Sequence, residues 1–141
     1  MMRVMTVIFA AVLVGTGGLS AQEVVLDIPA IAGKSEDEVA AVLGSPSGRE
    51  TTQHQGKALP KVLYRNGDVE VVYVNGKADW ITLYKALPLR QSSLAQLNLP
   101  IREPTFTRQG FVMRWEGGRV PGVQAVYFFR DYVYVNVLTS P

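Results

Sequence analysis

Apolar residues in the first part of the chain recur at the spacing of a helix. Val39 and Leu43 lie four residues apart, and this spacing predicts a helix with one apolar face. Ser35 can cap its start while Glu38, three residues later, reaches back to the cap. The acidic residues of this first turn suit the positive end of the helix dipole, which explains them without a metal ion. Gly44 is expected to end the helix.

After residue 60 the apolar residues follow the period of strands instead. We expect three antiparallel strands at residues 61–65, 69–74 and 79–84. Asn66-Gly67 and Asn75-Gly76 lie at the two joints, and Asn-Gly is a strong signal for a tight hairpin turn.

In two segments of this first part, the apolar residues follow neither the helical spacing nor the strand spacing. Residues 23–31 are apolar and contain Pro29, and we expect them to be extended. Residues 47–60 are polar and contain the single histidine of the chain, His54. They are predicted to form a loop without regular structure.

The order of these elements repeats after 54 residues. Leu43 and Pro46 recur as Leu97 and Pro100, and a Val-Tyr pair recurs at the same offset. The second set comprises a shorter helix at residues 92–97, a polar loop at 101–110 and strands at 111–116, 123–129 and 132–138. A repeat of this length indicates a duplicated structural unit. The sequence therefore predicts an α+β fold of two tandem units (residues 22–86 and 87–141), each a helix plus three antiparallel strands, packed as one domain.

Strand alternation assigns the side chains to two sheet faces. Helices are expected to pack on the face that carries Val72, Val74, Ile81, Leu83, Val126, Phe128, Val133, Val135 and Val137. The opposite face is expected to carry Val71, Tyr73, Trp80, Thr82, Tyr84, Ala125, Tyr127, Phe129, Tyr132, Tyr134 and Asn136. A hairpin with a bulge would reverse this assignment in the unit concerned.

Large aromatic side chains with polar tips are typical of binding hot spots. We therefore predict a partner-binding surface made by Tyr73, Trp80, Tyr84, Tyr127, Tyr132 and Tyr134. The alternatives are that these rings only stabilise the sheet through cross-strand pairs, or that one unit packs its face on the other.

The N-terminus has the pattern of a secretory signal peptide at residues 1–21. Arg3 precedes a short apolar run, and small residues lead to Ala21, after which we expect cleavage. The run is too short to span a bilayer core of about 30 Å, so no transmembrane segment is expected after cleavage. The alternatives are a retained anchor and a buried helix. Gln22 stands where a lipoprotein would carry cysteine, so no lipid anchor through cysteine is expected in this periplasmic or secreted protein.

Composition narrows the chemistry further. The chain has no cysteine and one histidine, which excludes disulfides, thiolate zinc sites and cysteine nucleophiles and argues against a serine triad. Its 14 basic and 12 acidic side chains give a net charge of only +2, so no nucleic-acid partner is expected. We predict no catalytic residue, no cofactor and no metal. A two-carboxylate hydrolase or a carbohydrate-binding protein using Trp80 and Tyr84 stays as an alternative.

One short motif resembles a known family. The residues that carry it are Gly33-Lys34-Ser35, Val39, Leu43-Gly44 and Pro46, followed by a three-strand run that contains tyrosine. This pattern resembles the SmpA/OmlA (BamE-like) family of small envelope proteins and the wider β-lactamase inhibitor protein (BLIP)-like fold, in which helices lie on one side of an antiparallel sheet. Members of the SmpA/OmlA family are typically lipoproteins, and the inhibitor proteins generally carry disulfides. Both features need cysteine, which this chain lacks.

The resemblance implies a noncatalytic module of the bacterial cell envelope that binds another envelope or extracellular protein, as outer-membrane assembly accessory proteins do. The alternative it implies is a secreted inhibitor of an enzyme, of the β-lactamase or cell-wall hydrolase type.

Overall fold

The computed structural model describes residues 23–138, so the expected signal peptide at residues 1–21 lies outside the described residues. Two short helices come first. The helix α2 (Ile28–Ile31) starts at Asp27, and its Pro29 lies in the first turn, where a missing N–H costs nothing. The expectation of an extended segment is therefore wrong at these positions.

The second helix, α3 (Glu36–Leu43), confirms the predicted capping box. The Ser35 hydroxyl accepts a hydrogen bond from the Glu38 N–H at 3.2 Å, and the Glu38 carboxylate accepts one from the Ser35 N–H at 3.0 Å. These hydrogen bonds lower the pKa of Glu38. Gly44 follows with a φ of 94°, a conformation that favours glycine and ends the helix.

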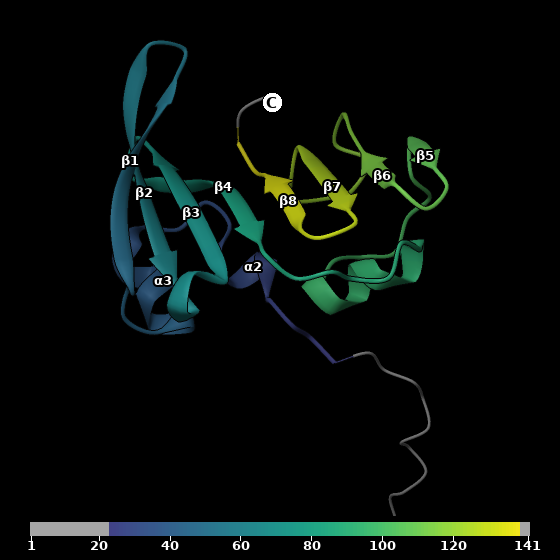
Figure 1. The fold of residues 1–141 in the computed structure, drawn as a ribbon, viewed down its shortest axis with the longest axis horizontal. Helices are drawn as coiled ribbons and strands as arrows, with labels where there is room; N and C mark the ends of the chain where they lie inside the picture. Colours follow the sequence, from purple (N-terminus) through teal and green to yellow (C-terminus); the bar gives the residue numbers. More distant parts are fainter. Residues whose placement is uncertain (1–22, 139–141) are drawn as a thin grey trace, which may run out of the picture.

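Eight strands follow the two helices. They are β1 (Gly48–His54), β2 (Lys57–Tyr64), β3 (Val69–Val74), β4 (Lys77–Leu83), β5 (Phe106–Arg108), β6 (Val112–Trp115), β7 (Ala125–Phe129) and β8 (Val133–Asn136). They form one antiparallel sheet in the order β1-β2-β3-β4-β8-β7-β6-β5. Each half of the chain thus contributes four neighbouring strands, and the halves meet where β4 pairs with β8 (Figure 1).

The expectation of three strands per unit is wrong in both halves. Residues 47–60, predicted as a loop, contain strand β1 and the start of β2, which are joined by a turn at Gln55 and Gly56. Residues 101–110 likewise contain β5. Both missed strands lie at the ends of the sheet, where neither face has to be apolar, so alternation gives no signal.

Two 3₁₀ segments complete the fold, η1 (Arg65–Gly67) and η2 (Gln91–Leu97). The second replaces the short helix expected at residues 92–97. It ends at Asn98, whose φ of 56° is left-handed, a conformation that asparagine tolerates.

One face of the sheet carries the core. Two rows of buried side chains cross the sheet in register, Val62–Val71–Ile81–Val135–Val126–Trp115 and Tyr64–Val69–Leu83–Val133–Phe128–Met113. Buried residues of α2, α3 and η2 join the same apolar cluster, namely Ile28, Ile31, Val39, Leu43, Leu94 and Leu97. Figure 1 shows α2, α3 and η2 on one side of the sheet. We call the opposite side of the sheet the open face.

A bulge in β4 overturns part of the predicted face assignment. The register between β3 and β4 shifts between Val72 and Tyr73, because Asp79 is an extra residue between Ala78, which pairs with Tyr73, and Trp80, which pairs with Val72. The core face of β3 therefore carries Val71 and Tyr73, while Val72 and Val74 lie on the open face with Trp80. The assignments for β4, β7 and β8 agree with the sequence prediction.

Candidate functional site

The centre of the open face carries a continuous cluster of aromatic rings contributed by strands from both halves. We call the following seven residues the ring cluster: His54, Trp80, Tyr84, Tyr127, Phe129, Tyr132 and Tyr134. His54 is at the end of β1, Trp80 in β4 and Tyr84 just after it, and the others are in or between β7 and β8. Each ring contacts the next in the cluster, so they form one surface rather than isolated side chains.

The ring contacts run across the sheet in an unbroken path. His54 lies edge-on to Trp80 with ring centroids 4.2 Å apart, and Trp80 lies edge-on to Tyr134 at 5.9 Å. The path continues with Tyr134–Tyr127 at 5.8 Å, Tyr127–Phe129 at 6.2 Å, Phe129–Tyr132 at 4.7 Å and Tyr132–Tyr84 at 6.2 Å. The five contacts among the Tyr, Phe and Trp rings fit the range of distances in which aromatic pairs attract one another, and His54 lies closer still to Trp80. The ring cluster is therefore held in place before any partner arrives.

A groove of about 560 Å³ runs along this cluster. Its lining is Thr82, Tyr84, Tyr127, Phe129, Tyr132 and Tyr134. Tyr84 and Tyr132 are 48% and 36% exposed, and the other four are partly exposed. A preformed, mainly aromatic concavity of this size is typical of a binding site.

Three tyrosine hydroxyls of the groove, those of Tyr84, Tyr127 and Tyr134, have raised pKa values and are neutral at ordinary pH. Burial, followed by the hydrogen bond from its hydroxyl to Glu70 (2.8 Å) and the charge of that carboxylate, raises the pKa of Tyr84 to about 12. Burial and then the charge of Glu116 raise the pKa of Tyr127, whose hydroxyl donates to that carboxylate at 3.3 Å. Burial and then Asp79 raise the pKa of Tyr134. The groove therefore combines apolar ring surfaces with uncharged polar tips.

Charges of opposite sign flank the ring cluster. On the β1–β3 side, Lys61 lies 3.7 Å from the carboxylates of both Glu50 and Glu70. On the β5–β6 side, the Arg114 guanidinium stacks over Phe106 at 4.1 Å and its Nε lies 3.9 Å from the Glu116 carboxylate. The rim thus carries charged groups on both sides of the rings, an arrangement that can orient a partner.

Arginine stacking extends beyond the groove at the turn before β6. Arg108 and Arg130 approach the ring of Phe111 at 4.9 and 5.6 Å, although Phe111 is 50% exposed. Such cation–π contacts hold arginine side chains in defined positions at a surface.

Five of the six predicted binding residues share this face, and Tyr73 does not. Its side chain is only 1% exposed, and its hydroxyl lies 2.7 Å from that of Tyr64 in the core. The prediction that Tyr73 belongs to the surface is wrong because the Asp79 bulge changes which face β3 presents. Sequence reasoning placed Phe129 on this face but did not include it among the binding residues.

His54 is the member of the ring cluster that sequence reasoning missed. It was expected to lie in an irregular loop, yet it ends β1 and packs on Trp80. The signal that could have located it is Gln55-Gly56, which forms a two-residue turn with φ values of 51° and 77°, as a tight hairpin requires.

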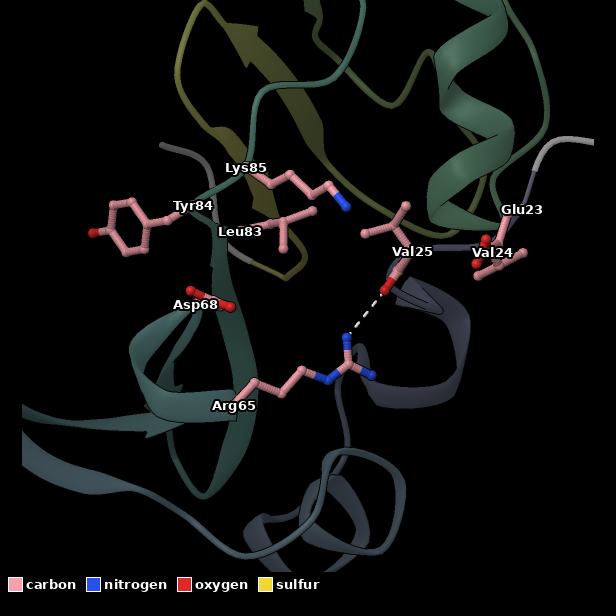
Figure 2. A pocket seen from close by; sticks show the side chains of 8 residues that line it. All are labelled: Glu23, Val24, Val25, Arg65, Asp68, Leu83, Tyr84 and Lys85. Carbon is pink, nitrogen blue, oxygen red and sulfur yellow. Dashed lines mark hydrogen bonds between the residues drawn. The ribbon is translucent and has the colours of Figure 1, made fainter.

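A second cavity, of about 540 Å³, lies near the start of the described chain. Figure 2 shows the Arg65 guanidinium directed at the carbonyl of Val25, to which it donates a hydrogen bond at 3.0 Å, while the Tyr84 ring points away. The Val25 N–H also donates to the Gln96 carbonyl at 2.7 Å. These two contacts hold Val25, which lines the cavity, against the rest of the fold.

The structure offers no ready metal centre in the part of the chain it describes, since residues 23–138 contain no group of three or more His, Asp or Glu side chains placed to hold an ion. None of the helices in that range is long and apolar enough to cross a membrane. Comparison of the chain with protein-family models, with curated proteins and with solved structures finds no significant match.

Proposed function

We propose that this chain is an exported, noncatalytic protein-binding module of the bacterial cell envelope, and that its partner binds on the open face. The observation that carries the proposal is the ring cluster, which occupies the centre of the sheet face opposite the helices. Protein interfaces concentrate their binding energy in a few aromatic and arginine side chains near the centre of the contact.

The groove supports a protein partner over a small charged ligand. Its lining is aromatic apart from Thr82, and the hydroxyls of Tyr84 and Tyr127 are kept neutral by burial and by nearby carboxylates. Charged residues lie at its rim instead, as in a typical interface with an apolar centre and a polar border. An apolar side chain of the partner would enter the groove while polar groups meet the rim.

Export to the envelope is proposed from the pattern of residues 1–21 and from the family resemblance of residues 33–46. We also propose that the fold is of the BLIP-like tandem type. Two features support this: the strand order is mirrored about the β4–β8 pair, and helical segments precede each set of four strands.

The second candidate function is that of a secreted enzyme inhibitor. The β1–β2 hairpin favours it, because residues 57–60 of β2 extend past the last residue pair with β3. Figure 1 shows this hairpin reaching beyond its neighbours. A projecting hairpin beside an aromatic groove could enter the active site of an enzyme.

The test is capture of a partner from the native envelope, using the purified chain as bait and chemical cross-linking to retain it. We expect one dominant partner, with its recovery reduced at least about tenfold by the double change Trp80→Ala and Tyr134→Ala, because loss of two hot-spot rings costs well over 1.4 kcal/mol. Thr82→Arg should act similarly by placing a charge in the groove without removing a ring.

The matched control removes two exposed apolar side chains elsewhere, by Val42→Ala and Ile101→Ala. Circular dichroism must show that every variant is folded. Equal recovery by the groove variants and the control would refute binding at the open face. Loss of turnover in a panel of β-lactamases and cell-wall hydrolases on addition of the chain would instead favour the inhibitor.

A further inference from the structure

The two end strands of the sheet differ in how far they are protected. The end strand β5 has only three residues, whereas β1 at the other end has seven. The pairing of β1 with β2 runs from Gly48 to His54 without a register shift. Natural proteins usually protect such edges by short strands, bulges, proline or charged side chains. Strand β1 is long, regular and free of proline, and its two charged residues, Arg49 and Glu50, are already paired with Glu36 and Lys61. It therefore offers a long, regular edge to another strand.

The turn at Gln55 and Gly56 fixes which backbone groups face this free edge. In a two-residue hairpin the flanking pair, His54 and Lys57, is hydrogen-bonded in both directions, and bonded pairs then alternate along the ladder. The N–H and C=O groups of Arg49, Thr51 and Gln53 must therefore point away from β2.

Two observations agree with this alternation of hydrogen-bonded and non-bonded pairs. Thr51 pairs with Pro60, which has no N–H and so suits a position without hydrogen bonds to β1. The Leu63 carbonyl, at a bonded position of β2, accepts a hydrogen bond from the Ser47 N–H at 2.7 Å. Among the turn, loop and cap hydrogen bonds between the backbone groups of described residues, none uses those of the three outward residues.

We infer that two copies of this chain associate through β1 as an antiparallel pair centred on Thr51. In this register Thr51 lies opposite Thr51 of the second copy, and Arg49 lies opposite Gln53 on either side. All three outward residues of each copy then form bonded pairs, which gives about six hydrogen bonds between the copies.

Charge and side-chain pairing select this register among its neighbours. A shift by two residues in one direction places Glu50 opposite Glu50 of the second copy, and like charges directly opposed are unfavourable. A shift in the other direction keeps only two of the three bonded pairs. The register centred on Thr51 has no like charges opposed, places a threonine pair at its centre and, because the contact is the same patch on both copies, closes as a dimer.

The symmetry has a consequence that rests on the proposed function. A twofold axis through Thr51 and perpendicular to the sheet leaves both open faces on the same side of one continuous sheet. The two ring clusters would then face the same direction, and a partner that repeats its binding segment could engage both at once with increased avidity.

The first test is sedimentation velocity of the purified chain over a range of concentrations, with no partner present. We expect a monomer–dimer equilibrium that Thr51→Lys weakens by roughly tenfold or more, because two ammonium groups would be opposed at the axis. Thr51→Val keeps a β-branched side chain and should remain dimeric. Thr107→Lys adds the same charge to the other end strand, β5, and should also remain dimeric.

The second test determines which residues of the two copies lie opposite each other. Because the chain has no native cysteine, single cysteines can be introduced along β1 one at a time. Oxidation of Thr51→Cys should give a covalent dimer in high yield, because bonded antiparallel pairs have Cα atoms about 5.5 Å apart, within disulfide range. Glu50→Cys and Thr52→Cys should cross-link poorly.

A chain that stays monomeric at about 100 µM would overturn the inference, because this concentration is well above the dissociation constant expected of a specific dimer. So would a dimer indifferent to Thr51→Lys, larger assemblies, or stronger cross-linking at position 50 or 52. Because these measurements need no partner, their failure is distinct from failure of the proposed binding face.

Discussion

At the scale of single residues, the clearest polar feature of the core is the pair formed by Tyr64 and Tyr73. Both side chains are at most 1% exposed, and their hydroxyl oxygens lie 2.7 Å apart. Burial raises the pKa of both phenols, so both stay neutral. Each hydroxyl gives the other a hydrogen-bond partner that water cannot supply there.

We therefore predict that Tyr73→Phe lowers the free energy of unfolding by about 1–3 kcal/mol, because it leaves the Tyr64 hydroxyl buried without its partner. The double variant with Tyr64→Phe should cost less than the sum of the two single changes, since it removes both polar groups. Urea denaturation of the four proteins in a double-mutant cycle measures this. Strictly additive costs would show that the two hydroxyls do not interact.

The same residue shows the limit of face assignment from sequence. Strand alternation assumes that successive residues always point to opposite faces of the sheet. On that basis it correctly placed Trp80, Tyr84, Tyr127, Tyr132 and Tyr134. It failed for Tyr73 because Asp79 adds one residue to β4 without any local signature in the sequence. The buried Asp79 carboxylate accepts a hydrogen bond from the Leu138 N–H, and its carbonyl accepts one from the Val137 N–H. The bulged residue is thus bound by residues more than fifty positions away in the sequence. A pattern of neighbouring residues cannot predict such a contact.

At the scale of elements, helix α3 was predictable because its start is determined locally. Ser35 and Glu38 lie in the same turn, and their reciprocal hydrogen bonds need no contact from elsewhere in the chain. Strand β1 was not predictable by hydrophobicity, because Arg49, Thr51 and Gln53 are all exposed. Its pairing with β2, rather than burial, makes it a strand.

We predict that Ser35→Ala destabilises the protein by about 1 kcal/mol, within the range of roughly 0.5–2 kcal/mol for loss of an N-cap. Chemical denaturation followed by circular dichroism measures the change. The control is Ser45→Ala, an exposed position just beyond the helix, which should change stability by less than about 0.5 kcal/mol. Equal effects at the two positions would mean that the cap contributes nothing specific.

At the scale of the whole molecule, the repeat predicted two units but not how they join. Successive hairpins follow from short turns, whereas the pairing of β4 with β8 brings together strands about fifty residues apart. Nothing in the spacing of apolar residues specifies that contact. Its result is a single apolar cluster that includes Ile31 and Ile81 of one half and Trp115 and Phe128 of the other.

We predict that the two halves unfold together in one cooperative transition. The chain has two tryptophans, Trp80 in the first half and Trp115 in the second. Trp115→Phe therefore leaves a fluorescence probe of the first half, and Trp80→Phe one of the second.

In each variant the fluorescence midpoint in urea should match the midpoint from circular dichroism, since one core cannot open by halves without exposing apolar surface. Fluorescence that changes well before the loss of secondary structure in either variant would indicate that the halves are independent.

The position of β8 in the sheet also determines the order in which the strands of a newly synthesised chain can pair. The first half can form its hairpins early, but the free side of β4 has to wait for β8, the last of the eight strands to be synthesised. Until then the first half carries an open edge, and such an edge invites aggregation. For the proposed export this delay is useful, because the sheet cannot be completed before β8 has been made. The same delay leaves the edge of β4 exposed until β8 pairs with it, and a chaperone that covers this edge would have most effect in that interval.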